Sequence, residues 1–299
     1  RAEDTGSVCP IMIANGRRID QRTMTAQQGN SAWFAEHLSH QGFDPIVIDG
    51  RDPAAFVWAI ISMEASLEEA SQKIKNGQLS YPVALPYCIA ETEKGFGFPG
   101  AGTNAAHGLP LQENPLHDET ARRLFNQGTR ALFNPEKSWR QAALCLAQPT
   151  KPYVANEVTV TRPEPKWLSL DKHYSSAQAM DDYFVELAEV NSKLRIRVGN
   201  PDELSSNRFG KTLELLKHRV TNPEANIAEA INGKVITALN EEAVISACLA
   251  NQQGLNLVVS YEAFAMKMLG AIRQSIIFSR HQKEVDDAAG WLSLPVVAT

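Results

Sequence analysis

The sequence predicts an α/β protein with two doubly wound, mostly parallel-sheet domains. Short apolar runs alternate with longer helical patterns in both halves of the chain, the order expected when helices cover both faces of a parallel sheet. Between the halves, residues 148–171 carry four prolines with little periodicity and are predicted to be a linker. The 299 residues are 43% hydrophobic and 21% charged, which is enough apolar material for two cores.

Capping residues define the helices of the first domain, residues 1–147. Asp52 followed by Pro53 puts a capping side chain before a proline at the first helical position, so a long helix should begin there. Asn30 or Ser31 can cap an earlier helix. The expected order is strand 9–14, helix 30–41, strand 44–49, helix 53–75, strand 81–90, helix 118–133 and helix 136–146.

The second domain, residues 172–299, resumes the alternation. The runs LRIRV, KVITAL and LNLVVS are rich in the branched residues that are typical of buried strands. The expected order is helix 176–192, strand 194–198, helix 206–218, strand 234–239, helix 241–251, strand 255–260, helix 261–281 and strand 292–298.

A glycine-rich loop follows the strand predicted at 81–90. It runs from Lys94 to His107, and its four glycines within residues 95–102, with Pro99 among them, exclude the interior of a helix or a sheet. Open α/β sheets bind ligands at the carboxyl ends of their strands, so this loop is a candidate ligand site. An ordinary surface loop explains the same spacing equally well.

Three further strand ends carry candidate functional side chains. Ser206 and Arg208 follow the strand LRIRV, Glu241 follows KVITAL, and Tyr261 and Phe264 follow LNLVVS. In parallel strands these ends lie along one edge of the sheet, where a ligand can reach all of them.

Each of these residues also has a purely structural explanation. Ser206 could cap its helix, and Arg208 could pair with Asp202. Glu241 could be an acidic residue favoured in a first helical turn. The two aromatic residues, three positions apart, could both belong to the core.

Taken together, these segments resemble one family. KGFGFPGAGTNAAHGLPL is similar to the loop of transketolase-like, thiamine-diphosphate-dependent enzymes that carries a catalytic histidine before Gly-x-Pro-Leu. NPDELSSNR resembles the GPDE…SNR motif of phosphoketolases, SYEAF resembles their segment of the same spelling, and PIMIANGRRI resembles their PILHLNGYKI. The order and approximate spacing agree over nearly the whole chain, so it is identified by resemblance as a phosphoketolase relative.

The resemblance implies thiamine diphosphate and Mg²⁺ as cofactors. Glu241 matches the glutamate that hydrogen-bonds the aminopyrimidine ring, Phe264 the aromatic residue that stacks on that ring, and Tyr261 its neighbour facing the active site. His107 and Lys94 match loop residues that reach the substrate and the intermediates, so Glu241, His107 and Lys94 are the expected catalytic residues.

Substrate binding follows from the same resemblance. Ser206 and Arg208 match residues that hold the sugar phosphate, for which the planar guanidinium of arginine is well suited. His107 and Lys94 are expected to contact the substrate as well.

The implied domains are both incomplete and of the thiamine-diphosphate-binding type. Residues 1–147 match the C-terminal part of a diphosphate-binding domain, and 172–299 match the N-terminal part of a pyrimidine-binding domain. The Gly-Asp-Gly…Asn motif for magnesium and diphosphate is absent from the sequence, and so is the family's His-Gln-Asp-Pro stretch, so the metal ligands are expected outside this chain. Because the first residue is Arg1, we expect a piece of a longer polypeptide that is inactive alone.

Other departures concern individual segments. The loop between Lys94 and His107 is shorter than in typical phosphoketolases and closer to transketolase. Two residues are gained between Gly254 and Tyr261, and the helix after Glu241 lacks the family's usual sequence.

The expected activity is cleavage of xylulose 5-phosphate or fructose 6-phosphate with inorganic phosphate, giving acetyl phosphate and an aldose phosphate. Transketolase-type two-carbon transfer and a non-catalytic scaffold relative are the alternatives. The resemblance implies a homodimer or higher homo-oligomer in which Glu241 lies at the interface, near Phe264 and facing His107 of the partner subunit. In such a dry pocket the pKa of Glu241 is expected to rise.

Composition excludes several other classes. A net charge of −5 argues against nucleic acid as a partner, and no apolar run is long enough for a membrane span. The four cysteines are scattered, without zinc-site spacing, as expected of reduced thiols in a cytoplasmic protein.

Overall fold

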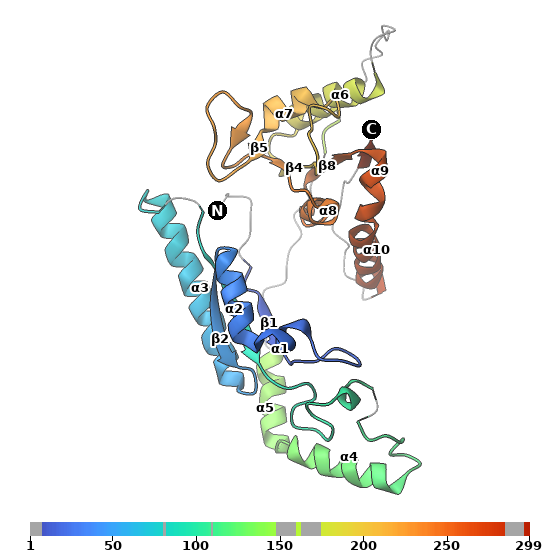
Figure 1. Ribbon diagram of the computed structural model, residues 1–299. Helices are drawn as coiled ribbons and strands as arrows, with labels where there is room; N and C mark the ends of the chain where they lie inside the picture. Colours follow the sequence, from blue (N-terminus) through green and yellow to red (C-terminus); the bar gives the residue numbers. More distant parts are fainter. Residues whose placement is uncertain (1–7, 80–81, 109, 148–159, 163–174, 285–295) are drawn as a thin grey trace. The chain divides into compact units, whose positions relative to one another are not determined.

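The computed structural model describes residues 8–79, 82–108, 110–147, 160–162, 175–284 and 296–299. The chain divides into two compact units, one built on Thr5–Pro152 and the other on Tyr153–Thr299 (Figure 1). The predicted linker at 148–171 lies outside the described residues except for 160–162. The assignment of domain ranges therefore stays a prediction.

The sheet of the first unit has three parallel strands. They are β1 (Ile11–Ala14), β2 (Phe43–Asp49) and β3 (Leu85–Glu91), in the order β1-β3-β2. The central strand β3 has the most apolar interior, because Cys88, Ile89 and Ala90 are fully buried. Pro45 is tolerated in β2 because an edge strand can lack one ladder donor.

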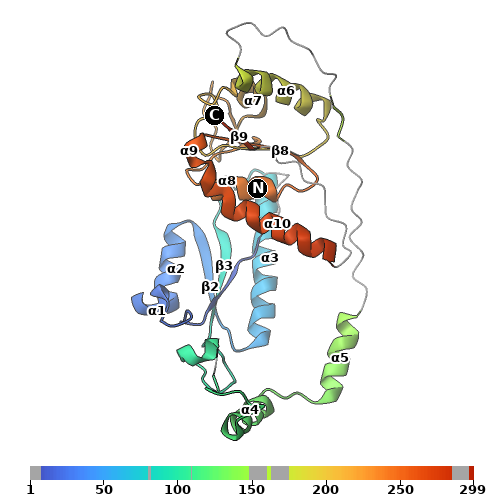
Figure 2. The ribbon, with the colours of Figure 1, turned by 90° about the vertical axis from the view of Figure 1, so that its right-hand side faces the viewer.

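Helices cover both faces of this sheet. They are α1 (Met24–Gln28), α2 (Asn30–His40) and α3 (Pro53–Lys75), with α2 and α3 on opposite faces (Figure 2). The predicted start of α3 is confirmed, since the Asp52 side chain accepts a hydrogen bond from the Ala54 amide at 2.9 Å. The cap predicted for α2 is wrong. Gly29 takes that place with a φ of 129°, because it must turn the chain directly from α1 into α2.

Turns form the glycine-rich loop after β3. Gly95, Gly97, Gly100 and Gly102 all have φ between 73° and 84°, a region that residues with a side chain rarely adopt. The loop ends in η1 (Asn104–His107), and the helices α4 (Glu119–Ala131) and α5 (Glu136–Leu146) follow as predicted.

The second unit contains a six-stranded parallel sheet. The order β6-β5-β7-β4-β8-β9 places β4 and β8 in the interior. Its strands are β4 (Ile196–Gly199), β5 (His218–Arg219), β6 (Glu229–Ala230), β7 (Val235–Ile236), β8 (Leu255–Ser260) and β9 (Val296–Ala298). Both sheets are parallel, so the predicted α/β fold class is confirmed.

Alternating side chains of β8 fill two cores. Leu257 and Val259 belong to one core with α6 and α7, while Val258 belongs to another with α8 and α10. The two helix groups cover opposite faces of the sheet (Figure 2). The helical segments are α6 (Ser176–Val190), α7 (Gly210–Leu216), α8 (Glu241–Leu249), α9 (Glu262–Ala265), η2 (Met266–Met268) and α10 (Leu269–Glu284).

Two predicted elements of this unit are shorter than expected, and a third is interrupted. The helix predicted at 206–218 begins only at Gly210, because residues 203–208 form turns closed by backbone bonds to Glu203, Leu204 and Ser205. The strand predicted at 234–239 is limited to Val235–Ile236, where β4 and β5 pair with it. The helix predicted at 261–281 is interrupted by η2.

Among the described residues, no helix is both long enough and apolar enough to cross a bilayer.

Candidate functional site

Three neighbouring strands of the second unit end beside one another, and five of the predicted site residues follow them. In the sheet, β4 lies between β7 and β8. Ser206 and Arg208 come after β4, Glu241 begins α8 after β7, and Tyr261 and Phe264 come after β8. Because the strands are parallel, these residues start from the same edge of the sheet.

Side-chain contacts connect Ser206 to Glu241 in one continuous path. The Tyr261 hydroxyl lies 2.7 Å from Ser206 Oγ, and the Tyr261 ring stands edge-on to the Phe264 ring with 6.2 Å between centroids. Lys267 Nζ is 4.7 Å from the Phe264 centroid and donates a hydrogen bond of 3.0 Å to Glu241 Oε1. We call these five residues the Ser206–Glu241 path.

The two aromatic residues of the path are not core residues. Tyr261 is 36% exposed and Phe264 is 37% exposed, so the structural explanation that placed them in the core is wrong. The fully buried side chain of this segment is that of Met268, which follows Lys267 in η2. In this segment the Met268 side chain therefore packs into the core, while the rings of Tyr261 and Phe264 face the solvent.

The carboxyl group of Glu241 is stabilised in its charged form. Its pKa lies below the usual value because its own backbone N–H and the Lys267 ammonium both favour the carboxylate, and these contacts outweigh its burial. The side chain is only 13% exposed. The expected rise in the pKa of Glu241 concerns the pocket of an assembled dimer, so it stays a prediction.

A tightly packed turn presents Ser206 and Arg208. Leu204, Asn207 and Phe209 are buried, whereas Ser206 and Arg208, which alternate with them, are exposed. Asn207 Oδ1 accepts a hydrogen bond from Asn200 Nδ2 at 3.0 Å, and Asn207 Nδ2 donates one to Thr299 Oγ1 at 2.7 Å. The buried neighbours fix the turn, so the exposed side chains project from a rigid backbone.

Two structural explanations for this turn are also wrong. Ser206 does not cap α7, since its hydroxyl donates to the Glu203 carbonyl at 2.6 Å and contacts Tyr261. Asp202, the suggested partner of Arg208, instead accepts a hydrogen bond from Ser260 Oγ at 3.1 Å.

Arg208 opens onto a small polar cavity of about 240 Å³. Its backbone has a φ of 70°, which is unfavourable for a residue with a side chain. The cavity is lined by Gln178, Asp181, Asp182, Arg208, Gly210 and Lys211. Two cationic side chains and two carboxylates line this cavity, and Lys211 already pairs with Asp182.

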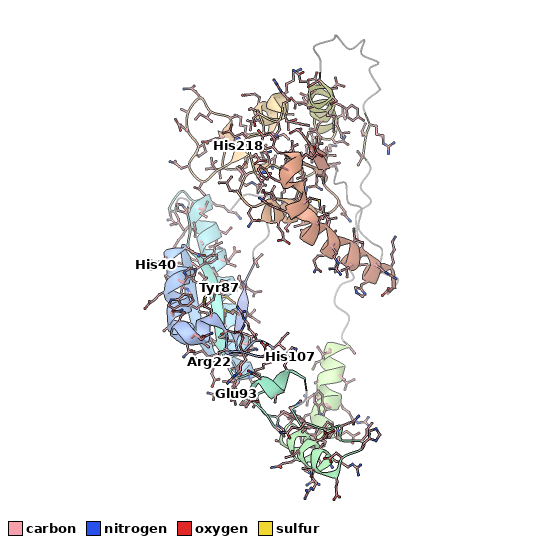
Figure 3. All side chains as sticks on the ribbon, turned by 45° about the vertical axis from the view of Figure 1, so that its right-hand side comes forward. Arg22, His40, Tyr87, Glu93, His107 and His218 are labelled. Carbon is pink, nitrogen blue, oxygen red and sulfur yellow. The ribbon has the colours of Figure 1, made fainter. Side chains whose placement is uncertain are left out.

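The first unit holds the other two predicted site residues. Lys94 Nζ donates a hydrogen bond to the Arg18 carbonyl, and His107, at the end of η1, is exposed (Figure 3). Arg17, which follows β1, ties the loop to the segment after that strand, since Nε donates to the Gly102 carbonyl at 2.8 Å and Nη1 donates to Asn104 Oδ1 at 2.8 Å. The loop conformation thus depends on Arg17.

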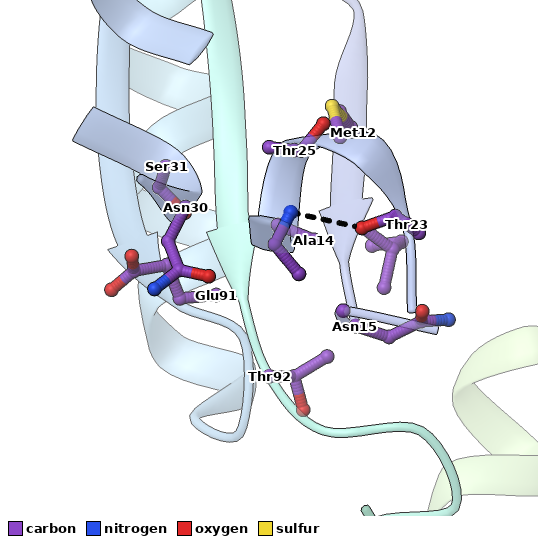
Figure 4. A pocket seen from close by; sticks show the side chains of 12 residues that line it. Met12, Ala14, Asn15, Thr23, Thr25, Asn30, Ser31, Glu91 and Thr92 are labelled. Carbon is purple, nitrogen blue, oxygen red and sulfur yellow. Dashed lines mark hydrogen bonds between the residues drawn. The ribbon is translucent and has the colours of Figure 1, made fainter. Parts of the chain in front are cut away.

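A cavity of about 250 Å³ lies at the carboxyl ends of β1 and β3 (Figure 4). Its polar lining comes from Asn15, Thr23, Thr25, Asn30, Ser31, Glu91 and Thr92. Thr23 Oγ1, on its wall, accepts a hydrogen bond from the Ala26 amide at 3.1 Å and caps α1. Neither Lys94 nor His107 lines this cavity.

Comparison with known protein families identifies the second unit. The family model of D-xylulose 5-phosphate/D-fructose 6-phosphate phosphoketolase matches residues 178–299. This segment is similar to phosphoketolases. The match supports a phosphoketolase-like function in general and a lyase-type enzyme. No curated protein matches the chain.

All residues of the Ser206–Glu241 path lie within the phosphoketolase match, whereas Lys94 and His107 lie outside it. Phosphoketolases use thiamine diphosphate, and the path offers two half-exposed aromatic rings beside a carboxylate, which suits a planar, nitrogen-bearing ring. For the metal, the described part of the chain contains no group of three His, Cys, Asp or Glu side chains that could hold an ion. The residues present therefore fit the ring of the cofactor and not its metal.

Two residues of the phosphoketolase segment were missed by the sequence analysis. Lys267 stands three positions after Phe264, and that spacing is the signal that could have revealed it. Asn207 lies inside the SNR motif, but nothing in the sequence shows that its side chain joins β4's end to Thr299.

Proposed function

We propose that this chain is part of a phosphoketolase-like lyase that cleaves xylulose 5-phosphate or fructose 6-phosphate with inorganic phosphate. The products are acetyl phosphate and an aldose phosphate. The observation that carries the proposal is the Ser206–Glu241 path, because it joins the ends of β4, β7 and β8 within the matched segment.

Ser206 and Arg208 are the proposed sugar-phosphate contacts. Both are exposed on a turn whose neighbouring side chains are buried, so their positions cost little further ordering on binding. Arg208 offers a planar fork that matches phosphate oxygens, and the Ser206 hydroxyl can donate or accept beside it.

Glu241, Phe264 and Tyr261 are the proposed contacts to thiamine diphosphate. When bound, the cofactor supplies the carbanion chemistry of the reaction. Phe264 and Tyr261 present exposed aromatic surface for a ring, and Glu241 holds or releases a proton at its carboxylate oxygens. Magnesium ligands are assigned to none of these residues.

Lys94 and His107 are proposed to reach the substrate from a glycine-rich loop, in a homodimer or higher homo-oligomer. Support comes from the loop's resemblance and from the exposure of His107. Sedimentation of the full-length protein tests the assembly, and a monomer at micromolar concentration would contradict it. A cytoplasmic location belongs to the same proposal, supported by four cysteines that are all free.

One observation favours a second candidate, a non-catalytic relative that keeps the fold as a scaffold. Glu241 is already engaged by Lys267 at 3.0 Å, and its lowered pKa makes it a weak proton donor near neutral pH.

Glu241→Gln separates the two candidates in the full-length enzyme. Gln keeps the shape and polarity of the side chain but cannot exchange the proton, so turnover should fall by about 10²-fold or more if Glu241 is catalytic. Acetyl phosphate formation from each sugar phosphate is the readout, with and without inorganic phosphate.

The matched control is Glu242→Gln. The Glu242 carboxyl lies against Gly270 of α10, and its substitution should leave turnover unchanged. If Glu241→Gln kept near wild-type turnover, Glu241 would lose its catalytic assignment. If the unchanged protein formed no acetyl phosphate, the scaffold would be the better conclusion.

A further inference from the structure

Lys267 joins Phe264 to Glu241 in the Ser206–Glu241 path. Its ammonium group contacts Glu241 Oε1 at 3.0 Å and lies 4.7 Å from the centroid of the Phe264 ring. In the proposed function, Glu241 and Phe264 are both contacts to the cofactor. A single side chain therefore touches the two groups on which that function depends.

The interruption of the helix after β8 determines where Lys267 lies. The 3₁₀ turn η2 carries Lys267, three positions after Phe264 of α9, which is itself three positions after Tyr261 at the N-cap of α9. Residues three apart are neighbours on a helix surface, and Phe264 contacts both Tyr261 and Lys267. Met268, next in the chain, is fully buried in the core between α8 and β8. The packing of Met268 thus fixes the backbone position from which the Lys267 side chain extends. The Lys267 side chain itself is 60% exposed.

The other charged groups around α8 point elsewhere. Glu242 faces Gly270 of α10, and Arg197 of β4 donates a hydrogen bond to the Ala247 carbonyl near the other end of α8. The strand β8, with the sequence LNLVVS, has no ionisable side chain. Within the described ranges, Lys267 is the cation that pairs with Glu241.

We propose that Lys267 is a positioning residue that holds the Glu241 carboxylate toward the Phe264 ring. The inference rests on the proposed role of Glu241. An ammonium at 3.0 Å favours the charged carboxylate, which accepts a hydrogen bond and cannot donate one. A proton shared between Glu241 and a ring nitrogen would then reside on the ring. The contact with Phe264 restrains the ammonium and keeps it beside the carboxylate.

The test measures the pKa of Glu241 directly. The chain is labelled with ¹³C at glutamate carboxyl carbons and titrated by NMR, with Glu241→Gln identifying the resonance. Lys267→Met, which keeps the length of the side chain without its charge, should shift the pKa upward. Lys267→Arg should restore it, and Lys283→Met, on the exposed end of α10, should leave it unchanged. Circular dichroism confirms that each variant is folded.

A second readout connects the pKa to the reaction. In the full-length enzyme, the acid limb of the pH–rate profile should move upward in Lys267→Met and return in Lys267→Arg. An unchanged Glu241 pKa in Lys267→Met would overturn the proposal, and so would a shifted pKa with an unmoved acid limb. Near wild-type turnover in Glu241→Gln would instead remove Glu241 from its proposed catalytic role, and no acetyl phosphate from the unchanged enzyme would overturn the proposed function, so the failures are distinguishable.

Discussion

Asp181 caps a helix to which it does not belong, and its removal should destabilise the second unit. It lies on α6, is 4% exposed, and accepts hydrogen bonds from the first turn of α7. The donors are the Lys211 amide at 3.0 Å, the Thr212 amide at 2.9 Å and the Thr212 hydroxyl at 2.6 Å. The residue at the N-cap position of α7, Phe209, supplies no side-chain bond of its own.

The magnitude follows from these three bonds. Hydrogen bonds to a charged acceptor contribute about 1.5–3 kcal/mol each, and buried donors left without a partner carry a further cost. Thr212 is fully buried, so water cannot replace the carboxylate there. Because two bonds share Oδ1 of Asp181, the contributions are not additive, and we expect Asp181→Ala to cost about 3–5 kcal/mol of unfolding free energy.

Urea denaturation followed by circular dichroism measures this cost, and hydrogen exchange at the α7 amides locates it. The matched control is Asp182→Ala, since Asp182 pairs with Lys211 at the surface and a surface pair contributes about 0–1 kcal/mol. In a double-mutant cycle with Thr212→Val, the coupling to Asp181 should be about 0.5–3 kcal/mol. The reasoning would be refuted if Asp181→Ala cost no more than Asp182→Ala.

Arg208→Ala should raise KM for the sugar phosphate in the full-length enzyme by roughly 30-fold to several hundred-fold, the equivalent of about 2–4 kcal/mol, with thiamine diphosphate affinity nearly unchanged. Steady-state kinetics measure both, and an unchanged KM would remove Arg208 from the substrate site. Burial raises the pKa of the Cys248 thiol to about 12 and also raises the pKa of Cys88, so a thiol reagent at pH 8 should label exposed Cys145 quickly and these two only after unfolding. Mass spectrometry of the labelled peptides checks this, and rapid labelling of Cys248 would contradict it. Burial lowers the pKa of His218 below its usual 6.5. Between that pH and the lower pKa of the folded state, the unfolded state binds more protons, so the free energy of unfolding decreases as the pH is lowered. Melting temperatures of His218→Gln should lose this slope, and an identical slope in both proteins would show that other groups cause it.

The sequence predicted most of the fold because its signals were local. The helix α3 begins at the predicted residue, since Asp52 and Pro53 act within one turn. The strand β8 has its predicted bounds, because LNLVVS is buried on both faces and needs no periodicity. Where a long-range contact decided the outcome, prediction failed. The turn at 203–208 replaces a helical start because Asn207 bonds residues far away in the chain.

The candidate site divides in the same way. Motif resemblance selected Ser206, Glu241, Tyr261 and Phe264, and the structure joins them in one path. Lys267 completes the path but belongs to no motif, because its role depends on the 3₁₀ turn that brings it beside Phe264. The lowered pKa of Glu241 was missed for the same reason.

The left-handed backbone at Arg208 makes the residue at this position informative about selection. A residue with a side chain pays about 1 kcal/mol or more at a φ of 70°, and glycine would not. A population of variants selected only for heat resistance should therefore drift toward Gly at 208, while the turn around it, fixed by Leu204 and Phe209, stays the same. Arginine is retained at 208 only while selection for a function of its guanidinium outweighs this cost in stability. The residue at position 208 therefore indicates whether a given relative still uses this turn for a function.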